Sequence, residues 1–371
     1  MRILTVVGAR PQFVKAAPVS RSLRRSHEEF LVHTGQHYDD AMSASFFREL
    51  EIPEPDLNLE VGSGSHALMT SEILRRLEPV VLEHRPDGVL VYGDTNSTLA
   101  AAIVGSKVAY DDGVRPWLAH VEAGLRSFNL AMPEERNRVV ADHLGDLLLA
   151  PTDAAMRNLE REGLGDRAEQ VGDVMVDAFS WAVERTEGRL PHVAGEHPGY
   201  LLLTLHRAEN VDDPRRLAAW VGALAGDRPV IFPIHPRTRA TLEGAAVALP
   251  ANLIPTEPAG YLEMVALERN AALVATDSGG VQKEAYLAGV PCVTLRTETE
   301  WVETVRAGWN RLAPRPADLP GAIAAALSGT PADRPPLYGD GLTAGRIVAA
   351  MERYVERRAD LGRRAMEATL R

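Results

Sequence analysis

The sequence predicts an α/β protein built from two doubly wound domains that face a cleft. Short apolar runs recur along the chain and alternate with helix-length segments of mixed polarity, which is the pattern of a repeated strand and helix unit. The runs are continuously apolar rather than alternating, as expected for parallel strands buried on both faces of a sheet. At 371 residues the chain is long enough for two domains, each with its own core.

The expected strands fall into two sets along the chain. The first set is Ile3–Val7, Phe30–Val32, Gly88–Tyr92, Trp117–Val121 and Leu147–Ala150, and the second is Tyr200–Thr204, Pro229–Phe232, Asn252–Ile254, Ala272–Ala275 and Pro291–Leu295. Thr98–Ala109 and Pro214–Ala225 have the length and mixed polarity of the helices between them.

A segment without apolar periodicity, Ala182–Gly199, separates the two sets and is rich in Glu, Arg, Gly, Pro and His. Such composition favours an interdomain connection. We therefore expect an N-terminal domain of residues 1–180 and a C-terminal domain of residues 181–349. The tail Thr343–Leu370 predicts a long charged helix or a pair of helices.

The composition of the chain excludes some classes of binding partner and indicates a cellular compartment. With 40 Lys and Arg against 51 Asp and Glu, the net charge is -11, and such a surface repels nucleic acid and anionic lipid. The single cysteine, Cys292, cannot form an intrachain disulfide, which fits a reducing compartment. The first apolar run is too short for a signal peptide, and no stretch reaches the roughly 18 apolar residues of a membrane helix. We expect a cytoplasmic protein.

Several expected strands end in a polar or charged residue. These ends are Gly8-Ala9-Arg10, Gly93-Asp94, His120-Val121-Glu122, Leu205-His206-Arg207, Ile234-His235 and Thr276-Asp277-Ser278. In open α/β sheets, ligands bind outside the carboxyl ends of the strands. Any one of these residues could simply mark the loop after its strand, but the whole set predicts a ligand site.

Two segments have the chemistry of phosphate sites. Ser278-Gly279-Gly280 precedes a helical segment, and its small residues would let backbone N–H groups approach a phosphate, although an ordinary Ser N-cap is the alternative. Glu284, about one turn further, could accept from ribose hydroxyls. In the first half, Arg10 and Lys15 flank a helix start, where cations are unfavourable unless an anion compensates them.

Carboxylates and imidazoles are available for proton transfer. Asp94, Glu122, Glu134 and Glu135 lie near the first-half strand ends, and His206 and His235 near those of the second half. Such groups, desolvated in a cleft, can act as general acids and bases. His33 and His37 have a metal-like spacing but no third ligand is evident, so no metal is expected. The chain has neither a strict Gly-x-Gly-x-x-Gly motif nor a Walker A loop.

Taken together, these segments resemble the nonhydrolysing UDP-N-acetylglucosamine 2-epimerases, in the family's order and from Arg2 to about Ile347. The segments are Gly8-Ala9-Arg10-Pro11-Gln12 with Lys15, Gly93-Asp94-Thr95, His120-Val121-Glu122-Ala123-Gly124-Leu125-Arg126, Met132-Pro133-Glu134-Glu135, His206-Arg207, His235-Pro236 and Asp277-Ser278-Gly279-Gly280. The resemblance implies two Rossmann-like domains of the glycosyltransferase B type, usually homodimeric, with the last helix, about 350–371, crossing back to the first domain.

The resemblance also implies a reaction. UDP-N-acetylglucosamine and UDP-N-acetylmannosamine would interconvert by anti elimination of UDP to 2-acetamidoglucal and its re-addition, with no nicotinamide or metal cofactor. Carried over by motif, the catalytic residues would be Asp94, Glu122, Glu134 and His206, and the residues that bind UDP or substrate would be Arg10, Lys15, Arg126, Arg207, His235, Ser278, Gly279, Gly280 and Glu284.

Two departures from the family pattern leave details open. Where some bacterial members bind a second UDP-N-acetylglucosamine as an activator, this chain has Gln36-His37-Tyr38-Asp39 and Glu72, and acidic groups there predict weak or absent activation. Ser127-Phe128-Asn129 and Glu298–Glu303 look closer to members that act on UDP-2,3-diacetamido-2,3-dideoxyglucuronate, which is therefore an alternative substrate. The alternative functional classes are a glycosyltransferase B type UDP-sugar transferase, a noncatalytic nucleotide-sugar sensor and a hydrolysing epimerase.

Overall fold

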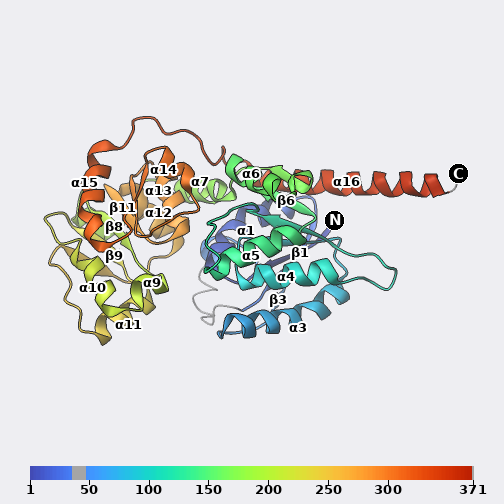
Figure 1. The fold of residues 1–371 in the computed structure, drawn as a ribbon, viewed down its shortest axis with the longest axis horizontal. Helices are drawn as coiled ribbons and strands as arrows, with labels where there is room; N and C mark the ends of the chain where they lie inside the picture. Colours follow the sequence, from blue (N-terminus) through green and yellow to red (C-terminus); the bar gives the residue numbers. More distant parts are fainter. Residues whose placement is uncertain (36–46, 370–371) are drawn as a thin grey trace. The chain divides into compact units, whose positions relative to one another are not determined.

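The computed structural model describes residues 1–35 and 47–369, with side chains described as far as Asp360. It divides into two compact units (Figure 1). Unit 1 consists of Met1–Ala178 together with the chain from Tyr338 onward, and unit 2 consists of Phe179–Leu337.

Unit 1 is built on a parallel sheet that has seven strands in the described part of the chain, in the order β3-β2-β1-β4-β5-β6-β7. The strands are β1 (Arg2–Val7), β2 (Glu28–His33), β3 (Leu57–Asn58), β4 (Gly88–Tyr92), β5 (Trp117–Val121), β6 (Leu147–Ala150) and β7 (Ala168–Gln170). Every residue of β4, β5 and β6 is buried, because helices cover both faces of a doubly wound sheet.

The helices of unit 1 form two layers. They are α1 (Arg10–Leu23), α3 (His66–His84), α4 (Asn96–Lys107), α5 (Pro133–Leu144), α6 (Asp153–Arg161), the start of α7 (Val174–Thr186) and α16 (Thr343–Thr369). Helix α4 packs between α3 and α5, while α1 packs against α16. Since β1 leads to β2 on one side and β4 to β5 on the other, right-handed crossovers place α1 and α4 on opposite faces.

Unit 2 repeats this architecture with six parallel strands in the order β10-β9-β8-β11-β12-β13. The strands are β8 (Leu201–Thr204), β9 (Val230–Pro233), β10 (Leu253–Thr256), β11 (Leu273–Thr276), β12 (Cys292–Thr294) and β13 (Asn310–Leu312), and the helices are α8 (His192–Glu196), α9 (Ala208–Val211), α10 (Pro214–Gly222), α11 (Pro236–Gly244), α12 (Tyr261–Asn270), α13 (Gly279–Ala288), α14 (Val302–Arg306) and α15 (Leu319–Gly329). Two apolar clusters, one centred on Trp220 and Phe232 and one on Leu202 and Val274, fill the two faces of the sheet.

The predicted α/β class is confirmed, and every apolar run expected to be a strand forms one. The strands that the sequence did not predict are β3, β7 and β13. Each has only two or three residues, lies at the edge of its sheet and is partly exposed. An edge strand is covered less than a central one, so it carries no continuous apolar run that would mark it in the sequence.

The unit boundaries differ from the expected ones. The first lies between Ala178 and Phe179, inside α7, which continues unbroken to Thr186. The expected connection Ala182–Gly199 therefore belongs to unit 2 and contains the end of α7 and all of α8. The expected second boundary at 349 falls inside α16, and the chain already joins unit 1 at Tyr338.

Contacts within unit 1 explain this early return. The backbone N–H of Asp173 donates to the carbonyl of Tyr338 at 2.9 Å. The carboxylate of Asp177 accepts from the backbone N–H groups of Thr343 and Ala344 at 3.1 and 2.8 Å. These two residues begin α16, so Asp177 satisfies N–H groups that have no partner within the helix. The segment before α16 is thus fastened to unit 1. Among the described residues, no helix has the length and apolarity to span a bilayer.

Candidate functional site

In unit 1 the turns after β4 and β5 bring charged residues together. Glu122 follows β5 with a φ of 71° and Gly93 follows β4 with a φ of 59°. A non-glycine residue in this left-handed region is strained, and such strain persists where surrounding contacts hold it. The Nζ of Lys15, from α1, is ion-paired with the carboxylate of Glu122. A Cβ at Gly93 would lie 3.2 Å from both charged groups, so glycine lets this pair approach the turn.

Asp94, the next residue after Gly93, faces α5. Its carboxylate pairs with Arg138 at 2.6 Å and its carbonyl accepts from the side chain of Asn137 at 2.8 Å. The side chain of Asp94 keeps 28% of its surface exposed. The carboxylate is therefore fixed in direction but still reachable from solvent.

The two adjacent glutamates at the start of α5 have different roles. Glu135 is buried, and its carboxylate accepts from the backbone N–H groups of Ser127 and Phe128, both at 2.9 Å, and from Arg138. Burial alone would raise the pKa of Glu135, but these hydrogen bonds outweigh it and lower the pKa. Glu134 is half-buried and makes no hydrogen bond or ion pair within the described part of the chain. Of the two, Glu134 is the carboxylate available to a ligand.

The start of α1 is organised by Gln12, a fully buried side chain. Its Oε1 accepts from the backbone N–H groups of Gly8 and Ala9 at 2.8 and 3.1 Å, and its Nε2 donates to the carbonyl of Tyr92 at 2.9 Å. These N–H groups are therefore already bonded, and an anion at this helix start would meet side-chain cations instead. Arg10 is the first residue of α1; burial lowers its pKa, and the charge of Glu49 opposes that effect.

Arg126, expected to bind substrate, lies in the interior of unit 1. Its guanidinium donates to Asp142 at 2.7 Å and to Glu162 at 2.8 Å, and 2% of the side chain is exposed. The geometry therefore does not bring Arg126 together with Lys15 and Asp94. Its role here is to neutralise the buried carboxylate of Asp142 and the half-buried one of Glu162.

In unit 2 the buried carboxylate of Asp277 organises two strand ends. It follows β11 and accepts from the backbone N–H groups of His206 and Arg207, at 3.2 and 3.0 Å, which follow β8. The Nε of Arg207 donates to the carbonyl of Asp277 at 2.9 Å. The imidazole of His206 remains 41% exposed. Asp277 thus fixes the backbone while leaving the His206 ring accessible.

A second imidazole lies beside His206. The ring centroids of His206 and His235 are 6.1 Å apart. His235 is the N-cap of α11, and its Nδ1 accepts from the backbone N–H of Arg237 at 3.2 Å. In the neutral ring the hydrogen therefore sits on Nε2, which makes that nitrogen a donor.

The start of α13 is open to a ligand. Ser278 is its N-cap but makes no side-chain cap bond, and Ser278, Gly279 and Gly280 are all half-buried. A Cβ at Gly279 would lie 2.5 Å from Oε1 of Glu300, whereas one at Gly280 would meet nothing closer than 4.0 Å. Gly279 therefore allows a close approach by Glu300, while Gly280 leaves space over the helix start.

Glu284, expected to bind ribose, lies one turn into α13 and is 6% exposed. Behind it on α12 is Glu268, which is fully buried. Burial raises the pKa of Glu268 well above its usual range, and the neighbouring charge of Glu284 and their hydrogen bond raise it further. A protonated Glu268 can act as a donor toward the Glu284 carboxylate.

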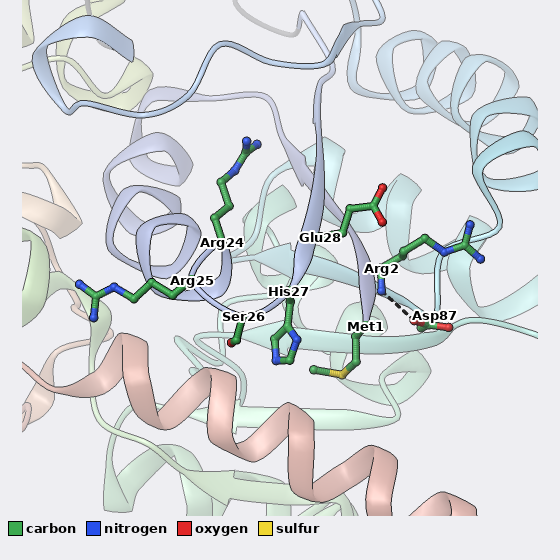
Figure 2. A pocket seen from close by; sticks show the side chains of 8 residues that line it. All are labelled: Met1, Arg2, Arg24, Arg25, Ser26, His27, Glu28 and Asp87. Carbon is green, nitrogen blue, oxygen red and sulfur yellow. Dashed lines mark hydrogen bonds between the residues drawn. The ribbon is translucent and has the colours of Figure 1, made fainter.

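A surface pocket lies elsewhere on unit 1 (Figure 2). It is lined by Met1, Arg2, Arg24, Arg25, Ser26, His27, Glu28 and Asp87. These residues surround the starts of β1 and β2 and the end of α1. They therefore lie at the amino-terminal ends of the strands, whereas the predicted site residues follow the carboxyl-terminal ends. Helix carbonyls point toward this end of α1, which disfavours an anion, so the pocket is not the candidate site.

Some expected features lie outside the described residues, namely His37 and the effector segment Gln36–Asp39. Glu72, the other effector position, is on α3, where it pairs with Arg75 and Arg76 at 2.8 and 3.0 Å. Among the side chains that the structure describes, in residues 1–35 and 47–360, no group of three or more His, Cys, Asp or Glu has the arrangement of a metal site.

Residues that position the site were not assigned by sequence reasoning. They are Gln12, Arg138, Asp142 and Asp277. A signal exists for two of them: Glu135, Arg138 and Asp142 recur at helical spacing, so they share one face of α5. All three are buried, and polar residues on the buried face of a helix indicate an internal network.

Comparisons with known proteins point to one family. The profile of a family described as UDP-N-acetylglucosamine 2-epimerase matches residues 21–352. A UDP-N-acetylglucosamine 2-epimerase homolog of Methanococcus maripaludis is 50% identical over 84% of this chain and 88% of its own length. The UDP-2,3-diacetamido-2,3-dideoxy-D-glucuronate 2-epimerase of Pseudomonas aeruginosa is 46% identical over 94% of this chain and 98% of its own.

Solved structures show the same likeness. The Methanocaldococcus jannaschii UDP-GlcNAc 2-epimerase in complex with UDP-GlcNAc and UDP aligns with a TM-score of 0.87 at 40% identity, over 95% of this chain and 99% of its own. A lipopolysaccharide outer core galactosyltransferase aligns with a TM-score of 0.52 at 13% identity, over 96% and 100% of the two chains. At that identity the likeness is one of fold alone, and it fits the expected glycosyltransferase B type.

Proposed function

The chain belongs to the UDP-N-acetylglucosamine 2-epimerase family and is an isomerase, and from this premise we propose that it interconverts UDP-N-acetylglucosamine and UDP-N-acetylmannosamine. The observation that carries the proposal is the presence in unit 1 of two reachable carboxylates, Asp94 after β4 and Glu134 at the start of α5, together with the Lys15–Glu122 pair at the turn of Gly93. A sugar transferase has no need of several carboxylates at the carbon next to the anomeric one.

Unit 1 supplies the proton chemistry. A carboxylate takes the proton from C2 while the C1–O bond breaks and its electron pair leaves with UDP, so that a C1=C2 double bond forms. Return of a proton to the opposite face of C2 and of UDP to C1 completes the inversion. Because protons move on both faces, two acid–base groups are required, and Glu122, Asp94 and Glu134 are the candidates. Lys15 holds the Glu122 carboxylate in place until a ligand competes for it.

Unit 2 binds the leaving group, UDP. The N-terminus of α13 presents N–H groups and the positive end of its dipole to the diphosphate, and Gly280 leaves room for it. Glu284 accepts from the ribose, and His206, His235 and Arg207 add donors to the diphosphate or its bridging oxygen. Arg10 of unit 1 adds a further cation. That the carboxyl ends of the strands in unit 1 and in unit 2 bind the same UDP-sugar molecule stays a prediction.

The diacetamido uronate remains a second candidate substrate. The Pseudomonas aeruginosa relative that is named for it covers more of this chain than the Methanococcus maripaludis relative does. The two substrates differ at C3 and C6, so a chain specific for the uronate needs a cation for its carboxylate.

The test is incubation of the full chain with UDP-N-acetylglucosamine in D2O, followed by NMR of the sugar. We expect deuterium at C2 and growth of the manno epimer without added cofactor. Glu122→Gln should abolish both, while Glu83→Gln, an exposed carboxylate on α3, should change neither. Exchange with the uronate alone would move the assignment to the second candidate, and release of UDP only with an acceptor would overturn the proposal.

We further propose a cytoplasmic homodimer. The lone cysteine is buried and free, which fits a reducing compartment. Light scattering on the purified chain tests the dimer, and a mass equal to one chain would contradict it.

A further inference from the structure

The turns that carry Asp94 and Glu122 are connected through one buried side chain, His120 on β5. The imidazole has no exposed surface. Its Nε2 lies 2.7 Å from the carbonyl oxygen of Gly93, directly before Asp94, and its Nδ1 lies 2.7 Å from Oδ1 of Asp142. Since no solvent reaches the ring, it cannot touch a substrate, and any effect on the reaction must pass through these neighbours.

Asp142 carries the connection onward to the second turn. Its Oδ2 accepts from the backbone N–H of Gly124 at 3.0 Å and from Arg126 at 2.7 Å. Gly124 is two residues after Glu122. An unbroken chain of hydrogen bonds therefore runs from the turn of Asp94, through His120 and Asp142, to the turn of Glu122.

The hydrogen positions on the ring follow from its neighbours. A carbonyl oxygen can only accept, so Nε2 donates to Gly93. Burial would raise the pKa of Asp142, but the charges of His120 and Arg126 hold it below its usual range. The other ring nitrogen, Nδ1, faces the carboxylate of Asp142, which also pairs with Arg126.

The two turns need such a connection. Glu122 is a non-glycine residue with positive φ, and such a strained residue relaxes unless its surroundings fix it. Gly93 adopts its positive φ without strain, so only its contacts hold it in place. Gly93 is held on both sides by β5, since its N–H donates to the carbonyl of Val121 at 3.0 Å and its carbonyl accepts from His120. Loss of the His120 bond would free the carbonyl next to Asp94.

We propose that His120 is a positioning residue for epimerisation, whose ring sets the distance between the Asp94 and Glu122 turns. This role rests on the function proposed above, because it supposes that both carboxylates act on one C2 centre. Small displacements of a catalytic group are enough to slow a reaction about 100-fold.

Two substitutions separate the two hydrogen bonds of His120, the one to Gly93 and the one to Asp142. In His120→Asn the amide occupies the position of Nδ1 and keeps the bond to Asp142, but the bond to Gly93 is lost. In His120→Gln the amide reaches the position of Nε2 and keeps the bond to Gly93. We expect the Asn variant to lose about 10- to 100-fold in kcat with KM little changed, and the Gln variant to recover much of that loss. His192→Asn, on an exposed ring of unit 2, is the matched control and should match wild type.

Amide hydrogen exchange of the same proteins tests the hydrogen bond between His120 and Gly93 independently of catalysis. The peptide that contains Gly93–Thr95 should exchange faster in the Asn variant than in wild type or the Gln variant. If wild type does not exchange the C2 hydrogen of either UDP-sugar with solvent, the proposed function fails. The amide exchange measurement still tests the His120 hydrogen bonds in that case. A wild-type kcat in the Asn variant, equal losses in both variants, or unchanged exchange at Gly93–Thr95 would overturn the role of His120. If the Asn variant does not fold, the Gln variant must keep wild-type exchange there, and faster exchange would overturn it.

Discussion

Replacing Glu268 by Gln should make the protein more stable at neutral pH. The raised pKa of Glu268 means that it binds a proton in the folded state at pH values where it has lost that proton in the unfolded state. Above its ordinary value of 4.5, unfolding therefore releases a proton, and stability falls as the pH rises until the folded carboxyl ionises. The slope for one proton is about 1.4 kcal/mol per pH unit.

Glutamine has the same shape, does not titrate and can donate to Glu284 as the neutral acid does. The variant should therefore lack this slope, and between pH 5 and pH 7 the difference from wild type should grow by up to about 3 kcal/mol. The assay is urea unfolding at pH 5, 6, 7 and 8, followed by tryptophan fluorescence, since Trp220 is buried in unit 2. Glu263→Gln, an exposed carboxylate on the same helix, is the control. Parallel pH profiles for wild type and the Glu268 variant would refute the reasoning.

Three further predictions concern packing and access. Gly279→Ala should destabilise unit 2 by about 1–3 kcal/mol, because its Cβ would displace the buried Glu300, whereas Gly280→Ala should be neutral or slightly stabilising in thermal unfolding. Arg126→Ala should lower stability by about 3–5 kcal/mol, since Asp142 and Glu162 both lose their ion pair with the guanidinium; a rise in KM at unchanged stability would instead support the substrate contact expected from the sequence. Cys292 should react with a thiol reagent at pH 8 only on unfolding, because burial raises its pKa to about 12, and rapid labelling of the native chain would contradict this.

The central strands could be predicted because a parallel strand between two helix layers must be apolar throughout. The edge strands could not, since β3 and β7 are short and partly exposed. The expected linker at Ala182–Gly199 was misplaced for a related reason. Composition changes there, but backbone hydrogen bonds continue through α7 to Thr186, and a change in polarity marks exposure rather than the end of a helix.

The candidate site was predictable in its chemistry but not in its pairings. Polar residues after buried strands indicate at which end of the strands a ligand is expected to bind, and this reasoning selected Asp94, Glu122 and His206 as candidates. It could not show that Lys15 pairs with Glu122, which is 107 residues away, or that Arg126 turns inward. Such pairings depend on how helices pack against the sheet, and no local pattern in the sequence encodes that distance.

The chain enters unit 2 through α7 and returns at Tyr338, and the residues on the unit 1 side of these crossings, Asp173 and Tyr338, are hydrogen-bonded to each other. Residues 179–337 are therefore an insertion whose ends start from adjacent points of the host. A domain whose two ends lie close together can be inserted or replaced as one continuous segment. Such an exchange would replace unit 2 while leaving the strands and carboxylates of unit 1 intact, because both junctions of the segment lie at neighbouring points of unit 1.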